Sequence, residues 1–172
     1  MSNHLDAVID AVIQREGGAK ATNDPLDPGG RTQYGISERA NPEAWRDGQV
    51  TAQEAREIFL SKYVVWPKFH TIPASHKWTQ EQLIDFGVHS GPSQATMKLQ
   101  ECLNEAGADP KLKIDGDFGS KTLQVLTGLD DRSINNLLMA ARIRLLGRVV
   151  QKNFNQLNKL SGFLGRALGF MK

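Results

Sequence analysis

Residues 2–18, SNHLDAVIDAVIQREGG, and the following residues 19–37, AKATNDPLDPGGRTQYGIS, decide how this chain folds. The apolar residues of the first segment recur at the i, i+3, i+4, i+7 and i+8 spacing of one helical face, at Leu5, Val8, Ile9, Val12 and Ile13. Gly17 and Gly18 favour the left-handed backbone that commonly ends a helix. The first segment therefore predicts an amphipathic helix.

Glu16 continues the apolar face of this helix, four residues after Val12 and three after Ile13. We expect its side chain to lie on the core side, where burial and the negative end of the helix dipole both disfavour the charged form. A glutamate that keeps its proton can donate it to a leaving-group oxygen as a general acid. The same position also fits a glutamate that bends out to solvent, and helix geometry alone leaves both interpretations open.

Turn chemistry dominates residues 19–37, where DP occurs twice and a Gly-Gly pair precedes the run RTQYGI at residues 31–36. This pattern predicts a loop and a small β-hairpin after the first helix. Glycosidases commonly use a second carboxylate near the anomeric carbon, and Asp24 and Asp27 are both candidates for it. Either aspartate can instead serve as a turn residue before proline.

Three further residues of this stretch are candidates for contact with a sugar. Thr32 can position an attacking water, and Gly30 lets the backbone turn closely against a ligand. Tyr34 lies beside Thr32 and offers an aromatic face for a pyranose ring, whereas we expect most of the other large aromatic residues in the core.

Capping residues and apolar spacing predict more helices along the chain. Thr51 and Glu54 form a capping-box pattern at the start of a helix in residues 50–66, and Thr79 and Gln82 form a second one. HSGPSQ, at residues 89–94, interrupts the second of these helices.

The C-terminal part continues the helical pattern. Ser120 is predicted to cap the helix KTLQVL, and a long helix is predicted from about Ser133 to Leu160, followed by a short basic, aromatic tail at residues 161–172. The fold class predicted by these patterns is mostly α with one small hairpin.

Charge is distributed unevenly along the chain. Eight basic residues and no acidic ones follow Asp131, and they are Arg132, Arg142, Arg144, Arg148, Lys152, Lys159, Arg166 and Lys172. With a net charge of +2, this leaves 2 − 8 = −6 for residues 1–131. The asymmetry indicates either an anionic partner or a solvated basic face.

Several kinds of site and several classes of protein are not expected. No apolar run approaches the roughly 20 residues needed to span a bilayer, and the first residues lack the pattern of a signal peptide. Cys102 is the only cysteine, which excludes an internal disulfide and suits a small buried residue. The histidine spacing predicts no zinc site, and IDGDFGS lacks the ligand pattern of an EF-hand. We expect no cofactor.

The motifs REGG, NDPLDPGGRTQYGIS and VTAQEAREIFLSKYVVW together resemble the N-acetylmuramidases of glycoside hydrolase family 108, many of which are phage endolysins. LIDFGVHSGPSQATMKLQECLN and IDGDFGSKTL resemble the C-terminal region of this family, which is often labelled a peptidoglycan-binding domain. The resemblance covers roughly residues 3–150. It implies a lysozyme-like fold, with a muramidase region at residues 1–78 and a helical, peptidoglycan-binding-like region at residues 79–172. We expect the two regions to share one core, because the second would bury little surface alone.

The resemblance also implies roles for the residues named above. Glu16, as the glutamate of the EGG motif, is the general acid on the β-1,4 bond between N-acetylmuramic acid and N-acetylglucosamine. By analogy with phage-type lysozymes, Asp27 and Thr32 take the other roles, with Asp24 as the alternative because the spacing differs from the phage-type pattern.

The function that follows is that of an endolysin which degrades peptidoglycan and causes host-cell lysis. We expect a monomer that is made in the bacterial cytoplasm, is released by a holin or its equivalent, and acts on the cell wall in the periplasm without binding nucleic acid. The tail at residues 161–172 can contact an anionic membrane or lipopolysaccharide, or pack against the protein itself. The alternatives are a lytic transglycosylase acting on the same bond and a non-catalytic peptidoglycan-binding protein.

Overall fold

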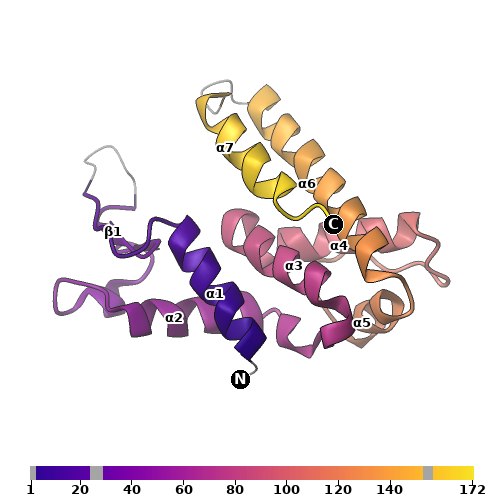
Figure 1. The fold of residues 1–172 in the computed structure, drawn as a ribbon, viewed down its shortest axis with the longest axis horizontal. Helices are drawn as coiled ribbons and strands as arrows, with labels where there is room; N and C mark the ends of the chain where they lie inside the picture. Colours follow the sequence, from indigo (N-terminus) through magenta and orange to yellow (C-terminus); the bar gives the residue numbers. More distant parts are fainter. Residues whose placement is uncertain (1–2, 24–28, 153–156) are drawn as a thin grey trace. The chain divides into compact units, whose positions relative to one another are not determined.

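A computed structural model of the chain describes residues 3–23, 29–152 and 157–172. Contacts divide the chain into two compact units, Met1–Val64 and Val65–Lys172, which are coloured from indigo to magenta and from magenta to yellow in Figure 1. This boundary precedes the one expected after residue 78. That the two regions share one core stays a prediction.

The first unit is built on α1, Asn3–Arg15, and α2, Ala52–Leu60, which pack against each other. The five apolar residues of the predicted α1 face are buried, which confirms the amphipathic helix. On the polar side, the Arg56 guanidinium joins the two helices by ion pairs to Asp6, at 3.0 Å, and to Asp10.

Local chemistry sets the start of α2. The Thr51 hydroxyl accepts a hydrogen bond from the Glu54 backbone N–H, and the Glu54 carboxylate accepts one from the Thr51 N–H, at 2.8 Å. This confirms the predicted capping box. The helix continues into a π-helical turn, η2, at Ser61–Val65, and a 3-10 turn, η1, at Pro42–Trp45 precedes it.

A two-stranded antiparallel hairpin lies between α1 and η1. Strand β1, Thr32–Gln33, pairs with β2, Ile36–Ser37, and Gln33 lies opposite Ile36. The two-residue loop consists of Tyr34 and Gly35, which both have positive φ, at 52° and 75°. Positive φ at both positions is typical of a type I′ turn, the loop that best matches the twist of paired strands.

The second unit is helical in its described residues. Two 3-10 turns, η3 at Phe69–Thr71 and η4 at Ala74–His76, lead into helices that pack α3 on α4 and α6, and α7 on α6 (Figure 1). The helices are α3 Lys77–Ser90, α4 Pro92–Glu105, α5 Ser120–Thr127, α6 Asp131–Lys152 and α7 Leu157–Leu168. Gly91 separates α3 from α4, as the HSGPSQ motif predicts. Cys102 is buried on α4, and this burial raises the pKa of its thiol to about 12.

The predicted cap of α3 is wrong. The helix begins at Lys77, before Thr79, and its N-terminus is capped from a distant position. The Asp131 carboxylate accepts hydrogen bonds from the Trp78 and Thr79 N–H groups, at 3.1 and 3.0 Å, and from the Thr79 hydroxyl, at 2.7 Å. A carboxylate at the N-terminus of a helix satisfies the same donors that a local cap would satisfy.

Two other helix boundaries also differ from the prediction. The N-cap of α5 is Gly119, and Ser120 is the first helical residue. The long helix predicted from Ser133 to Leu160 is two helices, α6 and α7, and α7 includes most of the tail at residues 161–172. The tail turns back because its side chains pack within the unit, where Ala167 and Phe170 are buried and the Phe163 ring meets the His89 ring edge-on at 4.5 Å.

A buried group of charges joins three helices of the second unit. The Asp85 carboxylate on α3 is fully buried and lies 2.7 Å from Arg142 Nη2 on α6 and 2.9 Å from Arg166 Nη2 on α7. Burial alone would raise the pKa of Asp85, but the hydrogen bond and charge of Arg166, together with Arg142, outweigh burial and lower it. Asp85 is therefore a structural, charged carboxylate.

None of the helices in the described part of the chain combines the length and the apolar character needed to cross a bilayer.

Candidate functional site

Glu16 directly follows Arg15, the last residue of α1. Its backbone N–H still donates to Val12 C=O at 3.0 Å, and the next two N–H groups turn back onto the helix, from Gly17 to Gln14 C=O and from Gly18 to Ile13 C=O. The glycines have φ values of +103° and +57°, so the end is a Schellman-type cap. The turn leaves Glu16 half-buried at the end of the apolar face.

The hairpin loop docks directly on this helix end. Tyr34 N–H donates to Gly18 C=O at 2.9 Å. Gly35 lies against the stem of the Glu16 side chain, because a Cβ atom added at Gly35 would come within 2.6 Å of Glu16 Cβ and 3.2 Å of Glu16 Cγ. The same added atom would lie 3.4 Å from Cζ of Phe59 on α2, so three segments of the unit meet at Gly35.

Tyr63 in η2 is the aromatic neighbour of this contact. Its ring lies 5.5 Å from the Phe59 ring, between centroids. Burial, and after it the negative charge of Glu16, raise the pKa of the Tyr63 phenol. The Glu16 carboxyl group is therefore close enough to the Tyr63 phenol to influence it electrostatically.

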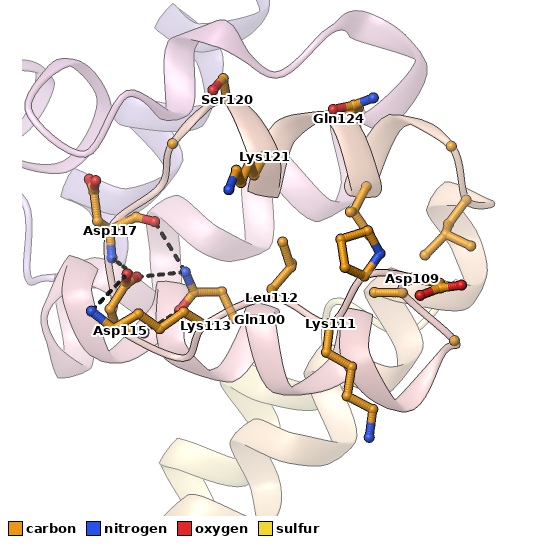
Figure 2. Close-up of a pocket in the computed structure, with 17 residues that line it drawn as sticks. Gln100, Asp109, Lys111, Leu112, Lys113, Asp115, Asp117, Ser120, Lys121 and Gln124 are labelled. Carbon is orange, nitrogen blue, oxygen red and sulfur yellow. Dashed lines mark hydrogen bonds and ion pairs between the residues drawn. The ribbon is translucent and has the colours of Figure 1, made fainter.

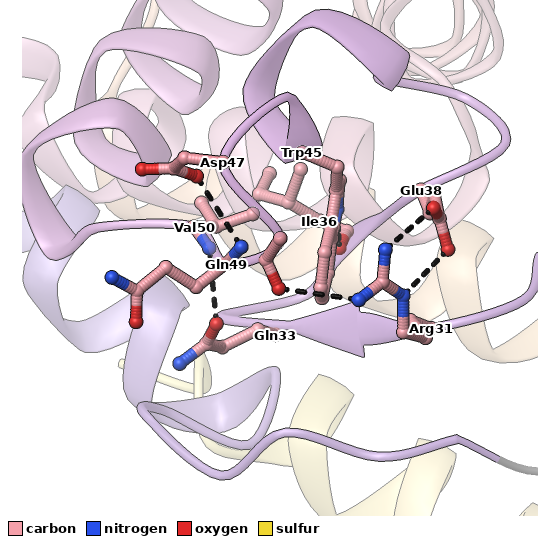
Figure 3. A network of polar contacts seen from close by, with 9 residues as sticks. Arg31, Gln33, Ile36, Glu38, Trp45, Asp47, Gln49 and Val50 are labelled. Carbon is pink, nitrogen blue, oxygen red and sulfur yellow. Dashed lines mark hydrogen bonds and ion pairs between the residues drawn. The ribbon is translucent and has the colours of Figure 1, made fainter.

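A polar network holds the outer side of the hairpin (Figure 3). The Arg31 guanidinium binds both Glu38 carboxylate oxygens, at 2.8 and 2.7 Å, and donates to Gly48 C=O at 3.2 Å. It also lies 4.8 Å above the centre of the Trp45 ring, whose indole N–H donates to Ile36 C=O. Its hydrogen bond to Glu38 raises the pKa of Arg31 and lowers that of Glu38, so both stay charged.

Gln33 joins the hairpin to both of its flanking segments. Its amide nitrogen donates to Ala19 C=O at 3.2 Å, just after α1, and its amide oxygen accepts from Val50 N–H at 3.0 Å, just before α2. Figure 3 shows the Gln33 side chain extending toward Val50. The position of the hairpin relative to α1 is thus fixed on both of its sides.

The residues predicted for the site fall into two groups. Glu16, Gly30, Thr32 and Tyr34 are described and lie at the end of α1 or in the hairpin, whereas Asp24 and Asp27 lie outside the described residues. The hairpin loop of Tyr34 and Gly35 is the segment that meets Glu16. The catalytic and sugar-binding roles of these residues stay predictions.

Thr32 and Gly30 lie where the loop carrying both aspartates returns to the hairpin. Thr32 exchanges backbone hydrogen bonds with Thr22, at 2.8 and 2.9 Å, and its hydroxyl lies 3.5 Å from Gly30 C=O. Gly30 has φ +72°, a conformation that favours glycine.

Sequence reasoning missed Arg31, Gln33 and Gly35, and it counted Tyr63 among the aromatic residues expected mostly in the core. Gly35 and Tyr34 together form the signal that could have been used, because a two-residue loop with glycine between two short strands predicts a turn with positive φ. The contacts of Gln33 and Tyr63 depend on segments far along the chain and have no local pattern.

Across residues 3–23, 29–152 and 157–172, no three or more His, Cys, Asp or Glu side chains cluster in a way that could hold a metal ion.

The second unit contains an open pocket of about 840 Å³ between the segment at residues 107–119 and α5 (Figure 2). Gln100 fixes this segment, because its amide oxygen accepts from Asp115 N–H and Gly116 N–H, at 3.1 and 3.0 Å, and its nitrogen donates to Asp115. The IDGDFGS motif is therefore a tight turn tied to α4. Three lysines and three aspartates line the pocket together with apolar residues.

The family model described as glycosyl hydrolase 108 matches residues 9–91. Residues 9–91 form a glycosyl hydrolase 108 region. That region includes Glu16 and the hairpin. The family supports a glycoside hydrolase that acts on peptidoglycan.

A solved structure of SagA from Brucella abortus is similar over nearly the whole chain. It is 28% identical, with a TM-score of 0.67, and the match covers 97% of this chain and 95% of that chain. Together with the hairpin after α1, this similarity confirms the mostly helical, lysozyme-like fold. A search among curated proteins finds no match.

Proposed function

We propose that the chain hydrolyses the β-1,4 bond between N-acetylmuramic acid and N-acetylglucosamine in peptidoglycan, as enzymes of the lysozyme type do. The observation that carries this proposal is the position of Glu16 within the glycosyl hydrolase 108 region, at the end of α1 and against the hairpin loop. The side chain is half-buried, so part of it remains accessible while its stem is packed.

The proposed reaction begins with a proton transfer from Glu16 to the glycosidic oxygen. The bond between that oxygen and the anomeric carbon breaks, and the positive charge that develops on the ring is stabilised by a second carboxylate. A water molecule then adds to the anomeric carbon and passes a proton to one of the two carboxylates, so that the net reaction is hydrolysis of the bond. Thr32 would position that water, and Tyr34 and Gly30 would contact the sugar.

The second carboxylate is Asp27 in this proposal, with Asp24 as the alternative. Both lie in the sequence between Thr22 and Thr32, whose backbones pair with each other. Their proximity to Thr32 along the chain supports the assignment.

Mass spectrometry of the fragments released from purified peptidoglycan tests the reaction type. Hydrolysis leaves reducing sugar ends, whereas a lytic transglycosylase would make the 6-hydroxyl of the muramic acid attack in place of water. Ends that are 1,6-anhydro would contradict the hydrolase proposal. A chain that binds peptidoglycan and releases no fragment would support the non-catalytic alternative.

Activity of Asp27→Asn and Asp24→Asn on the same substrate assigns the second carboxylate. We expect Asp27→Asn to lose more activity than Asp24→Asn, and the opposite order would transfer the role to Asp24.

We further propose that the cellular role is that of a phage endolysin, made in the host cytoplasm as a monomer and acting on the wall in the periplasm after release. The test is expression in a bacterium with and without a co-expressed holin, with optical density as the readout. Lysis that needs both the holin and Glu16 would support the role. Unchanged growth in the presence of the holin would contradict it.

Contact with an anionic membrane or lipopolysaccharide through residues 161–172 is a weaker proposal. Leu168 and Met171 are exposed, but Arg166 is paired with Asp85, and Phe163 and Phe170 pack within the unit. Co-sedimentation with vesicles containing anionic lipid, compared with neutral vesicles, tests it.

A further inference from the structure

Hydrogen bonds to the segments around the hairpin hold its loop in contact with Glu16. Tyr34 has φ 52°, a value that side-chain-bearing residues adopt only at a cost, and three hydrogen bonds keep the loop in place. They are Tyr34 N–H to Gly18 C=O, Gln33 Nε2 to Ala19 C=O, and Val50 N–H to Gln33 Oε1. These hydrogen bonds to the surrounding segments keep the turn in its unfavourable backbone conformation.

The loop presents bare backbone to Glu16. A Cβ atom at Gly35 would lie 2.6 Å from Glu16 Cβ, closer than non-bonded carbon atoms approach each other, and would also crowd Glu16 Cγ and Phe59 Cζ. The absence of a side chain at Gly35 therefore sets where the Glu16 stem can lie.

We propose that Gly35 is a positioning residue for the general acid, and that the bare backbone of the hairpin loop fixes the direction in which the Glu16 side chain points. This inference rests on the proposed function, because it needs Glu16 to be the proton donor. A shift of about 1 Å in a catalytic group can lower a rate by about 100-fold. A methyl group at Gly35 would force a displacement of that order.

The first test compares Gly35→Ala with Gly107→Ala. Both glycines have positive φ, at +75° and +99°, so alanine is strained at either position. At Gly107 an added Cβ would meet no atom within 4 Å, which makes this variant the control for backbone strain alone. The substrate is solubilised glycan strands, and the readout is the rate of new reducing ends across substrate concentration and pH.

We expect Gly35→Ala to lower kcat by about 10- to 100-fold with little change in KM, and to change the pH range over which the enzyme is active. Gly107→Ala is expected to keep the wild-type kcat and pH profile per folded molecule. A merely structural role for Gly35 would lower the folded fraction and leave kcat per folded molecule and the pH profile unchanged. That outcome would overturn the proposal.

A double-mutant cycle of thermal unfolding covers the case in which Gly35→Ala folds poorly. Glu16→Gly removes the Cβ and Cγ atoms that the new methyl group would meet, so we expect Gly35→Ala to lower Tm less in the Glu16→Gly background than in the wild type. Equal losses of Tm in the two backgrounds would show that the two residues do not collide, and the proposal would fail.

Different results would contradict the proposed function and the positioning role of Gly35. If the wild-type chain releases no fragments from peptidoglycan, the proposed function fails whatever the cycle gives. If the wild type is active and Gly35→Ala is as active as Gly107→Ala, only the positioning role fails.

Discussion

Glu16 in the first unit and Asp85 in the second are both carboxylates that are at least partly buried, but they are held in different ways. Asp85 is fully buried between two arginines, which keep it charged. Glu16 is half-buried, and its stem lies against the bare backbone of Gly35. Charge pairing thus fixes a carboxylate for a structural role, whereas packing against the stem of a side chain can orient a carboxyl group and leave its acid function intact.

The largest expected effect on stability comes from breaking the charge pairing in the second unit. Asp85→Asn leaves the buried Arg142 without its anionic partner, and we expect the free energy of unfolding of this unit to fall by about 3–5 kcal/mol. Urea unfolding followed by circular dichroism measures this loss. Asp109→Asn, at an exposed position of the same unit, should change it by less than about 0.5 kcal/mol, and equal effects would refute the structural role of Asp85.

Acid should lower the stability of the second unit by protonating the Asp85 carboxylate. Because the pKa of Asp85 is lowered on folding, its stabilising effect is present above its ordinary value of 3.8 and is lost as the pH falls below 3.8 toward the folded pKa. We expect the Tm of the wild type to fall with pH more steeply in this range than the Tm of Asp85→Asn. Parallel curves for the two proteins would contradict this linkage.

A smaller effect is expected where polar contacts hold the hairpin. Gln33→Leu removes the partners of Ala19 C=O and Val50 N–H, and we expect the first unit to lose about 1–2 kcal/mol, because water can replace part of these bonds. The rate of fragment release should also fall, since the loop against Glu16 is less well anchored. Gln49→Leu, an exposed glutamine nearby, is the control. If both variants behave alike, Gln33 does not anchor the hairpin.

The smallest expected effect is that of the local cap of α2. Thr51→Ala removes the hydroxyl that accepts the Glu54 N–H, at a cost of about 0.5–1 kcal/mol in the free energy of unfolding. Thr51→Ser keeps the hydroxyl and should stay close to the wild type. A serine variant as unstable as the alanine variant would show that the hydroxyl does not carry the effect.

Features that depend on neighbouring residues could be predicted from the sequence. The buried face of α1, the capping box of Thr51 and Glu54, and the break near Gly91 each follow from residues within a few positions of one another. The hairpin was indicated in the same way, by glycine and turn residues around a short strand-forming run.

Features that depend on distant residues could not be predicted. The cap of α3 is Asp131, which is 52 residues from Thr79, and no local pattern points to it. Gly162 and Gly165 weaken a helical reading of the tail, yet α7 forms because its apolar face packs and because Arg166 reaches Asp85. Tertiary packing outweighed local preference in both cases.

In the candidate site, too, local features could be predicted and contacts between distant residues could not. Glu16 could be named from periodicity and family motifs, because both are local. The contact that positions its stem comes from Gly35 in the hairpin loop, which reaches it only after the chain has folded.

The central claim is that Glu16 is the proton donor of a peptidoglycan hydrolase, and the most direct measurement compares Glu16→Gln with Glu57→Gln on purified peptidoglycan. Glu57 is an exposed glutamate on α2 and serves as the matched control. We expect Glu16→Gln to be folded by circular dichroism and to release fragments about 100- to 10,000-fold more slowly than the wild type, while Glu57→Gln keeps the wild-type rate. A folded Glu16→Gln variant that works at nearly the wild-type rate would contradict the claim.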